Sequence, residues 1–337
     1  MPHHRAIIPT TLLALTLALT GTSASAQAPL LAGERDAQVT AIPGVVATGA
    51  QWQLVWADFE TADGIVGSPG GGVLFAQEQS DSVRHLDTNH TETIVVPNAR
   101  GPGAVSLDAE GRLFAVQRTC TDPGRAFSQS CAELTQVVQL LPDFRVLANR
   151  FPDGSSLGRL NDLIADGKGG AYFTVGGAWH VSADGAIDTV ADQNIRSNGI
   201  MLNQDGTVLY VTNNTEVLAF DVQPDGSTSN RRVFGTLDGD EGGDGMAIDN
   251  ANRLYVTGTL GVHVLDADGA YLGLIPTPRR PITLAFSGLN RKTLYVPSMG
   301  AVGPDGKAWT TPTGVRNTAM TIYTLPMESQ GFAGRPK

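Results

Sequence analysis

The chain has 337 residues, of which 33 are Asp or Glu, 23 are Lys or Arg and 40 are Gly, and its formal net charge is −10. This length is enough to bury a large core, and long all-β folds form one unit at this size. The negative charge argues against nucleic acid as a partner, because the phosphates would be repelled. It is compatible with a bound cation or with a neutral or cationic substrate.

The first residues read MPHHRAIIPTTLLALTLALTGTSASAQA, a basic start followed by an apolar run and the small residues ASA. This order is typical of a secretory signal peptide. We therefore expect residues 1–26 to be removed and the mature protein to be exported, either to a periplasm or out of the cell. A retained membrane anchor is the less favoured alternative, because the apolar run is short and no later segment is apolar enough to span a bilayer.

The two cysteines of the chain, Cys120 and Cys131, lie close together in QRTCTDPGRAFSQSC. An exported protein meets an oxidising environment, which favours a disulfide across this short polar loop. A metal site would need more Cys or His close by in the sequence, and there are none. We predict a disulfide between Cys120 and Cys131.

One phrase recurs six times, a turn rich in Gly, Asp or Asn followed by an apolar, β-rich run. The copies are SPGGGVLFAQ (68–77), LDAEGRLFAVQ (107–117), ADGKGGAYFTV (165–175), LNQDGTVLYVT (202–212), IDNANRLYVTG (248–258) and FSGLNRKTLYVP (286–297). Their aromatic residues follow one another at intervals of 37 to 59 residues, and the longest interval contains the cysteine loop. Units of about 40 residues with four short strands each are typical of a β-propeller.

We predict an all-β, six-bladed β-propeller, because there are six units and no long segment has a helical period. The propeller is expected to form a single domain over residues 51–330, preceded by an N-terminal extension or linker over residues 27–50. The alternative is a sandwich of unrelated hairpins, which the regular spacing and the constant order of turn and strand disfavour.

The innermost strand of every propeller blade runs along a central channel, so equivalent positions in different blades point toward one axis. We compare the residue four positions before the apolar residue that precedes each turn. In chain order these residues are Asp63, Gly103, Asn161, Asn198, Asp244 and Ile282. Asn-Gly and Asp-Gly are also common hairpin turns. Here, however, such pairs precede the strand, and a separate turn follows it.

Four of these six side chains carry an oxygen, and they belong to Asp63, Asn161, Asn198 and Asp244. Hard oxygen donors suit Ca²⁺ first, with Mg²⁺, Mn²⁺ or Zn²⁺ as alternatives. Two buried carboxylates without a cation would be costly. We therefore expect one divalent cation, most simply Ca²⁺, in a central metal channel.

At these positions the sequence resembles the senescence marker protein, gluconolactonase and luciferin-regenerating enzyme family. The likeness covers about residues 52–325 and is strongest in GRLNDLIADGKGGAYFT, RSNGIMLNQDGTVLYVTNN and GDGMAIDNANRLYVTG. The resemblance implies a six-bladed propeller with one divalent metal in its channel. It also implies an enzyme that hydrolyses sugar lactones or other cyclic esters.

The resemblance gives roles to individual residues. Asn198 of the SNG motif would be a metal ligand, and Asp244 of the DGM motif would be both a ligand and the catalytic residue. Arg159 and Asn161, of the R-x-N-D motif, would contact substrate, with Asn161 close to the metal.

The sequence departs from the family pattern at the first ligand. The family has a Glu there, usually in EGP, whereas the matching stretch here is ADGIV. This puts the shorter Asp63 in the ligand position, with Glu60 as the alternative ligand.

These observations predict a metal-dependent lactone hydrolase. The cation would polarise the ester carbonyl, Asp244 would accept a proton from the attacking water, and Arg159 and Asn161 would hold substrate oxygens. A water-bridged arrangement and Asp63 as the base both stay open as alternatives. Two other functions also stay open: hydrolysis of another ester such as an organophosphate, and a non-catalytic binding propeller whose metal ties the blades together.

Overall fold

The computed structural model describes residues 30–337 except residues 59, 119–133, 193, 301–309, 312–313, 316–318 and 336. The predicted signal peptide and the predicted Cys120–Cys131 disulfide lie outside the described residues. Across the described ranges the regular structure consists of strands, and no α-helix occurs among them. No helix long and apolar enough to cross a membrane is found in that part of the chain.

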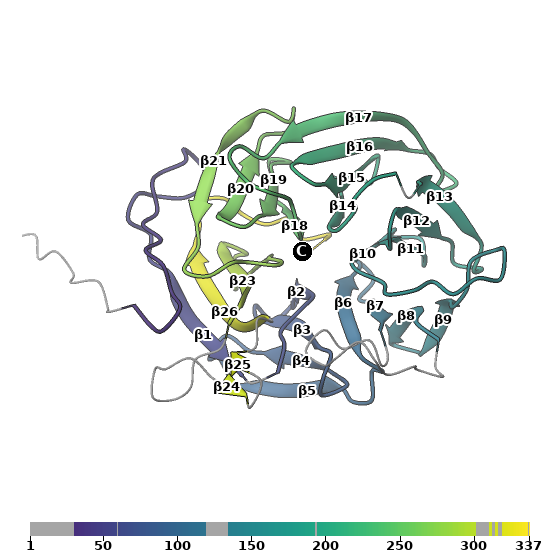
Figure 1. Ribbon diagram of the computed structural model, residues 1–337, viewed down its shortest axis with the longest axis horizontal. Coiled ribbons are helices and arrows are strands. Elements are labelled where there is room, and N and C mark those ends of the chain that lie inside the picture. The colour runs from purple at the N-terminus through teal and green to yellow at the C-terminus, as the bar shows by residue number, and fades with distance from the viewer. Residues whose placement is uncertain are drawn as a thin grey trace, which may run out of the picture.

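Six four-stranded antiparallel sheets surround one axis, which confirms the predicted six-bladed β-propeller (Figure 1). The first five blades each use four consecutive strands, beginning at the axis and ending at the rim. Blade 1 comprises β2 (Ile65–Gly67), β3 (Val73–Gln77), β4 (Ser82–Leu86) and β5 (Glu92–Val96). Blade 2 comprises β6 (Pro102–Leu107), β7 (Leu113–Gln117), β8 (Gln136–Leu141) and β9 (Arg145–Ala148). Blade 3 comprises β10 (Leu163–Ala165), β11 (Ala171–Thr174), β12 (Ala178–Val181) and β13 (Ile187–Ala191).

The remaining blades follow the same plan, except that the last one is completed by the N-terminal strand. Blade 4 comprises β14 (Ile200–Leu202), β15 (Val208–Asn213), β16 (Glu216–Val222) and β17 (Thr228–Thr236). Blade 5 comprises β18 (Met246–Ile248), β19 (Leu254–Thr257), β20 (Gly261–Leu265) and β21 (Tyr271–Pro276). Blade 6 comprises β22 (Ala285–Ser287), β23 (Thr293–Met299), β26 (Ala319–Pro326) and β1 (Gln53–Ala57). Between β23 and β26, the strands β24 (Thr310–Thr311) and β25 (Gly314–Val315) pair antiparallel with each other.

The pairing of β1 with β26 joins the start of the propeller to its end and closes the ring without a free gap between blades 1 and 6. The residues before β1 are also packed, because Val39, Ile42, Val45 and Val46 are buried against a core cluster that includes Tyr255. The stretch expected as an extension or linker therefore lies partly against the propeller.

The core follows the repeated phrase of the sequence. The aromatic residue that marks each unit lies on the second strand of its blade and is buried. These residues are Phe75, Phe114, Phe173, Tyr210, Tyr255 and Tyr295. Alternate residues of a strand face opposite sides of its sheet, so each blade can bury apolar side chains against both neighbouring blades.

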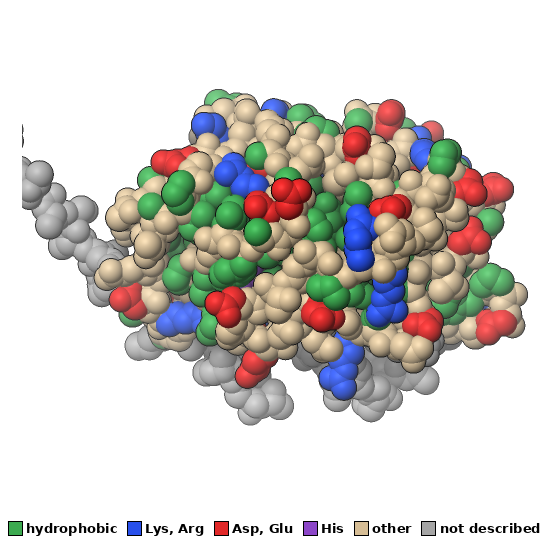
Figure 2. Space-filling view, turned by 90° about the horizontal axis from the view of Figure 1, so that it is seen from above, with side chains coloured by type: hydrophobic (Ala, Val, Ile, Leu, Met, Phe, Trp, Pro, Cys, Tyr) green, Lys and Arg blue, Asp and Glu red, His purple; other side chains and the backbone are tan. Residues whose placement is uncertain are grey.

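On the side of the propeller shown in Figure 2, acidic and basic side chains are interspersed.

The starts of the innermost strands share one hydrogen-bonding register in four blades. The carbonyl groups of Gly64, Asp162, Gly199 and Gly245 accept hydrogen bonds of 2.8, 3.0, 3.1 and 3.0 Å from Ala76, Thr174, Thr212 and Thr257. Each acceptor directly follows one of the four predicted metal ligands. The equivalence of the four positions, inferred from sequence spacing, is therefore present in the backbone.

Three of these positions carry Gly because neighbouring blades approach each other there. A Cβ on Gly199 would lie 2.0 Å from the carbonyl oxygen of Asp244, and a Cβ on Gly64 would lie 2.3 Å from Cα of Ala104. A Cβ on Gly245 would lie 2.4 Å from Oγ1 of Thr283. The Asn-Gly and Asp-Gly pairs thus serve close packing around the axis.

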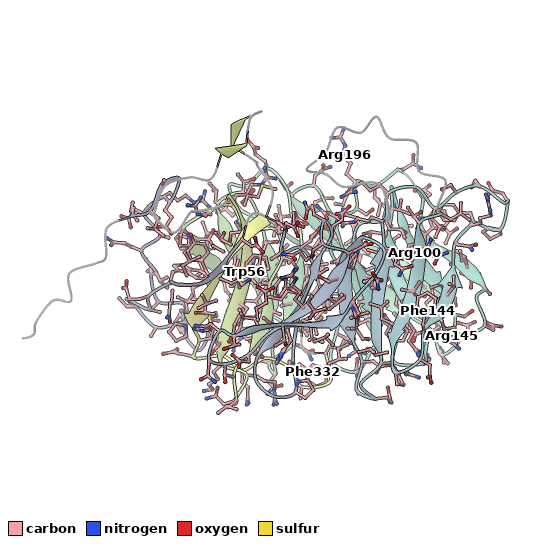
Figure 3. The ribbon with its side chains drawn as sticks, turned by 90° about the horizontal axis from the view of Figure 1, so that it is seen from below. Trp56, Arg100, Phe144, Arg145, Arg196 and Phe332 are labelled. Carbon is pink, nitrogen blue, oxygen red and sulfur yellow. The ribbon has the colours of Figure 1, made fainter. Side chains whose placement is uncertain are left out.

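After β26 the chain crosses one face of the propeller toward the axis, where the label of the C-terminus lies in Figure 1. Asn250 donates to the carbonyl of Gln330 (2.8 Å) and Phe332 donates to the carbonyl of Ile248 (3.3 Å). Figure 3 shows Phe332 and Arg196 on opposite faces of the propeller. Arg196 comes just before Asn198 in the sequence. The predicted ligand Asn198 is therefore reached from the face of Arg196, opposite the face that the C-terminal segment crosses.

Candidate functional site

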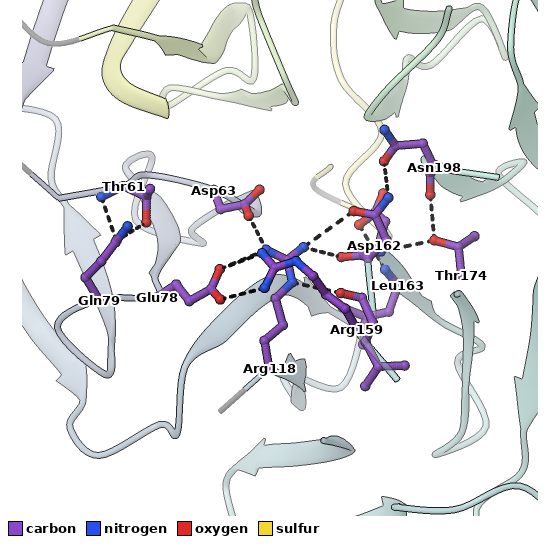
Figure 4. A network of polar contacts seen from close by, with 12 residues as sticks. Thr61, Asp63, Glu78, Gln79, Arg118, Arg159, Asp162, Leu163, Thr174 and Asn198 are labelled. Carbon is purple, nitrogen blue, oxygen red and sulfur yellow. Dashed lines mark hydrogen bonds and ion pairs between the residues drawn. The ribbon is translucent and has the colours of Figure 1, made fainter. Parts of the chain in front are cut away.

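The predicted site residues of blades 3 and 4 are in direct contact at the axis. Nδ2 of Asn161 donates to Oδ1 of Asn198 at 2.6 Å. The hydroxyl of Thr174, at the end of β11, donates to the carbonyl of Asn198 at 2.6 Å and so ties blade 3 to blade 4. These contacts hold the two carboxamides beside each other (Figure 4).

Asp63 of blade 1 reaches the same network through Arg118, a residue that the sequence reasoning missed. Nη1 of Arg118 forms an ion pair with Oδ2 of Asp63, and Nη2 donates to the carbonyl of Asn161 at 2.8 Å. Arg118 is 3% exposed. Among the described residues no hydrogen bond or ion pair joins Glu60 to these groups. Of the two candidate ligands Asp63 and Glu60, Asp63 is therefore the one that contacts this network.

Glu78 is a second residue of this network that the sequence reasoning missed. Its buried carboxylate accepts hydrogen bonds from both terminal nitrogens of Arg159, at 3.0 and 3.2 Å, and one from Arg118 at 3.1 Å (Figure 4). Burial raises the pKa of Glu78, and the two guanidinium groups oppose that rise. The side chain of Arg159 is 30% exposed, so part of it is accessible from solvent.

A signal for both missed residues exists in the sequence. Glu78 and Arg118 each come directly after a Gln that ends a buried strand, in FAQE and FAVQR of neighbouring units. A charged side chain immediately after a buried strand indicates a polar contact at the end of that strand. Counted from the aromatic residue of each unit, the charged residue comes one position later in FAVQR than in FAQE. A comparison at a fixed distance from the aromatic residue therefore does not align Glu78 with Arg118.

Asp162 and Lys337 form another ion pair beneath the ligand positions. Nζ of Lys337 contacts Oδ1 of Asp162 and donates to the carbonyl of Leu163 at 3.3 Å. Lys337 is 1% exposed, and the other oxygen of Asp162 accepts from the backbone of Ile200 at 3.3 Å. This lysine therefore supplies positive charge to the axis from the face opposite Arg196.

Asp244, the predicted catalytic residue, is partly buried and has an unusual charge environment. Burial raises its pKa to about 8, with further contributions from the negative charges of Asp63 and Asp162, against the opposing charges of Arg280 and Arg118. Its backbone donates to the carbonyl of Thr257 at 2.7 Å, in the same ladder that orients the other ligand positions. A cation bound at this buried carboxylate would favour its charged form and lower its pKa.

This charge environment predicts a pH effect on stability in protein freed of cations. The pKa of Asp244 is higher in the folded state than in the unfolded state, so folding takes up a proton and stability falls as pH rises from about 4 to 8. Asp244→Asn removes this loss. We expect the variant to gain about 2–4 kcal/mol relative to the parent between pH 4 and pH 8, measured by urea unfolding in a chelator. A difference between the two proteins that stays constant with pH would contradict this prediction.

The donors fit a hard cation. Within the described ranges, no group of three or more His, Cys, Asp and Glu side chains is placed to hold a metal ion. The candidate set consists instead of two carboxylates and two carboxamides on four blades, a set of oxygen donors that Ca²⁺ or Mg²⁺ accepts. Burial and the nearby carboxylates of Asp63 and Asp162 raise the pKa of Asp244, and a bound cation would oppose that rise.

The fold and the axial site together define a propeller with a buried polar centre, and comparison with known proteins gives its family. The family model described as SMP-30/Gluconolactonase/LRE-like region matches residues 75–300. The chain therefore belongs to this family, as the sequence motifs indicated.

Named relatives are similar at low identity. Lactonase drp35 of Staphylococcus haemolyticus is 28% identical over 295 residues, covering 78% of this chain and 81% of that protein. A gluconolactonase of Zymomonas mobilis is 28% identical over 166 residues, covering 40% of this chain and 47% of that protein.

Solved structures agree on the fold. A gluconolactonase of Xanthomonas campestris has a TM-score of 0.66 at 20% identity, covering 89% of this chain and 98% of that chain. A calcium-binding protein, regucalcin, of Agrobacterium tumefaciens has a TM-score of 0.61 at 16% identity, covering 84% of this chain and 95% of that chain. At these identities the structures establish the propeller fold alone.

Proposed function

We propose that the protein is a hydrolase that opens lactones with the help of one divalent cation, Ca²⁺ being the first candidate. Family membership and the named lactonases among the relatives support the lactone hydrolase. The observation that carries the proposal is the placement of Asp63, Asn161, Asn198 and Asp244 at one register around the axis. A sugar lactone or a related cyclic ester is the proposed substrate class.

Asn198 and Asp244 would hold the cation, together with Asn161 and the second oxygen of Asp63. When bound there, a divalent cation supplies a Lewis acid for the ester carbonyl. Asp244 takes the proton of the attacking water as general base.

The chain's other residues bind and orient the substrate. Arg159 binds substrate oxygens, and Glu78 orients its guanidinium through two hydrogen bonds. The water oxygen bonds to the carbonyl carbon, the ring carbon–oxygen bond breaks, and the proton held by Asp244 passes to the departing alkoxide. The products are the carboxylate and hydroxyl ends of one open chain, with the proton of the acid released to solvent.

Arg159→Met is expected to raise the KM for a lactone about tenfold and to change kcat less, because this residue contributes binding throughout the reaction. Steady-state kinetics measure both constants. Arg232→Met is the matched control, since Arg232 pairs with Asp221 in an exposed ion pair. Equal KM values for the Arg159 variant and the parent would remove Arg159 from substrate binding.

The proposed activity is tested with a panel of five- and six-membered lactones, together with an aryl ester and an organophosphate triester. Acid release is followed by pH indicator or pH-stat, and the rate of spontaneous opening is subtracted. Lactone opening above the spontaneous rate supports the proposal. Activity on the aryl ester or organophosphate alone would change the substrate class, and inactivity on all compounds in folded, cation-loaded protein would favour a binding propeller.

We also propose that the protein is exported after removal of residues 1–26 and that Cys120 pairs with Cys131. The sequence order of the N-terminus and the cysteine loop support this proposal. N-terminal sequencing of protein secreted by its own signal and thiol titration under denaturing conditions test the two parts separately. An intact N-terminus or two titratable thiols would refute the corresponding part.

A further inference from the structure

Blade 2 contributes no oxygen donor at the register of the candidate ligands, because Gly103 occupies that position. Arg118, just after β7, fills the space. A Cβ on Gly103 would lie 2.0 Å from Nε and 2.1 Å from Cζ of Arg118. The glycine is therefore required for the guanidinium to occupy this sector of the axis.

The guanidinium of Arg118 is saturated by protein acceptors from blades 1 and 3 (Figure 4). A guanidinium has five N–H donors. Nε donates to the carbonyl of Leu160 (2.8 Å), and Nη1 contacts Asp63 and donates to Glu78 (3.1 Å). Nη2 donates to the carbonyl (2.8 Å) and to Oδ1 (3.5 Å) of Asn161. Arg118 thus has no donor left for a substrate and acts on the site through Asp63 and Asn161.

The charge of Arg118 is permanent and lies against a predicted metal ligand. Burial opposes the charged form, but the carboxylates of Asp63 and Glu78 outweigh it and hold the pKa of Arg118 above its ordinary value. Charges interact strongly in a buried site, where the effective dielectric constant is far below that of water. A divalent cation on Asp63 would therefore meet a fixed positive charge already paired with that carboxylate.

We propose that Arg118 is a built-in cation of the site, which pairs with Asp63 and thereby weakens the binding of a divalent cation. The ion is then held mainly by Asn198 and Asp244, and Asp63 contributes little to its affinity. This inference rests on the cation site of the proposed function and deepens it by assigning a positioning residue that sets cation affinity.

Isothermal titration of calcium chloride into chelator-treated protein tests the inference without any substrate. Arg118→Met is expected to bind Ca²⁺ about tenfold more tightly than the parent or better, because one like charge is removed from the site. Arg118→Lys, which keeps the charge, is the matched control and should stay within about threefold of the parent. Equal or weaker binding by Arg118→Met overturns the inference, as does an absence of Ca²⁺ binding by the parent and all variants.

Asp63→Asn on both backgrounds sharpens the test. In the parent it should change Ca²⁺ affinity by less than about threefold, and in Arg118→Met by about tenfold or more, because only there is the carboxylate free for the ion. Equal effects on the two backgrounds would overturn the inference.

If Arg118→Met lacks a cooperative unfolding transition, Gly103→Ala replaces it, since the added Cβ displaces the guanidinium. Gly103→Ala that folds and binds Ca²⁺ no more tightly than the parent would overturn the inference.

The two proposals fail separately. A protein without lactonase activity can still show tighter Ca²⁺ binding in Arg118→Met, which would leave the inference standing and remove the proposed reaction. A cation-dependent lactonase whose Ca²⁺ affinity is unchanged by Arg118→Met would leave the proposed reaction standing and refute the inference.

Discussion

Asp244→Asn is expected to lower kcat for lactone opening by about 10²–10⁴-fold, the range typical for loss of a general base. The substitution keeps the shape of the side chain, but the carboxamide has no basic oxygen for the proton of the attacking water. It also removes one of the two carboxylates from the candidate cation site. Initial rates at saturating lactone and saturating Ca²⁺ measure the loss in kcat apart from weaker binding.

The matched control for this experiment is Asp188→Asn, since Asp188 is exposed on β13 at the rim of blade 3. Its kcat should equal that of the parent. Circular dichroism and a cooperative thermal transition establish that Asp244→Asn is folded. A folded Asp244→Asn protein with the parent's kcat would remove Asp244 from the reaction and would favour Asp63 as the base.

Glu78→Ala is expected to lower the free energy of unfolding by about 3–5 kcal/mol, because it breaks a buried network of charges and leaves Arg159 without its carboxylate. Glu78 accepts three hydrogen bonds from Arg118 and Arg159, and its side chain is 1% exposed. Urea unfolding followed by tryptophan fluorescence in a chelator measures the loss without a contribution from bound cation.

Asp221→Ala is the control for this prediction. Its ion pair with Arg232 is exposed, with side-chain exposures of 40% and 39%, so its loss should lower the free energy of unfolding far less than Glu78→Ala does. A loss below about 1 kcal/mol for Glu78→Ala would show that the buried network contributes little to stability.

The propeller could be predicted from sequence because the same physical requirement is repeated six times. Each blade needs a tight turn and an aromatic residue buried on its second strand, and Phe75, Phe114 and Phe173 mark three of the copies. The register of the candidate ligands could be predicted for the same reason, since the β-ladder fixes which residue begins each innermost strand. Family membership, shown by the match over residues 75–300, agrees with this fold.

The charged partners of the candidate ligands could not be predicted in the same way. Arg118 and Glu78 come directly after the repeated phrase, but their pairing joins residues from different blades, and sequence position alone does not indicate it. Lys337 lies in a segment without strand pattern, and only the path of the chain across the propeller brings it to Asp162. Local periodicity carries no information about such contacts, which depend on tertiary packing.

The cation dependence of lactone opening tests the central claim most directly. The protein is stripped with a chelator, Ca²⁺ is restored in steps, and the corrected rate of lactone opening is compared with the fraction of cation bound in the same buffer. We expect activity to vanish on stripping and to return in proportion to occupancy of one site per chain, with Asp244→Asn slower by about 100-fold or more at every Ca²⁺ concentration. Full activity in stripped protein that contains no residual metal would contradict the claim that a divalent cation takes part in the reaction.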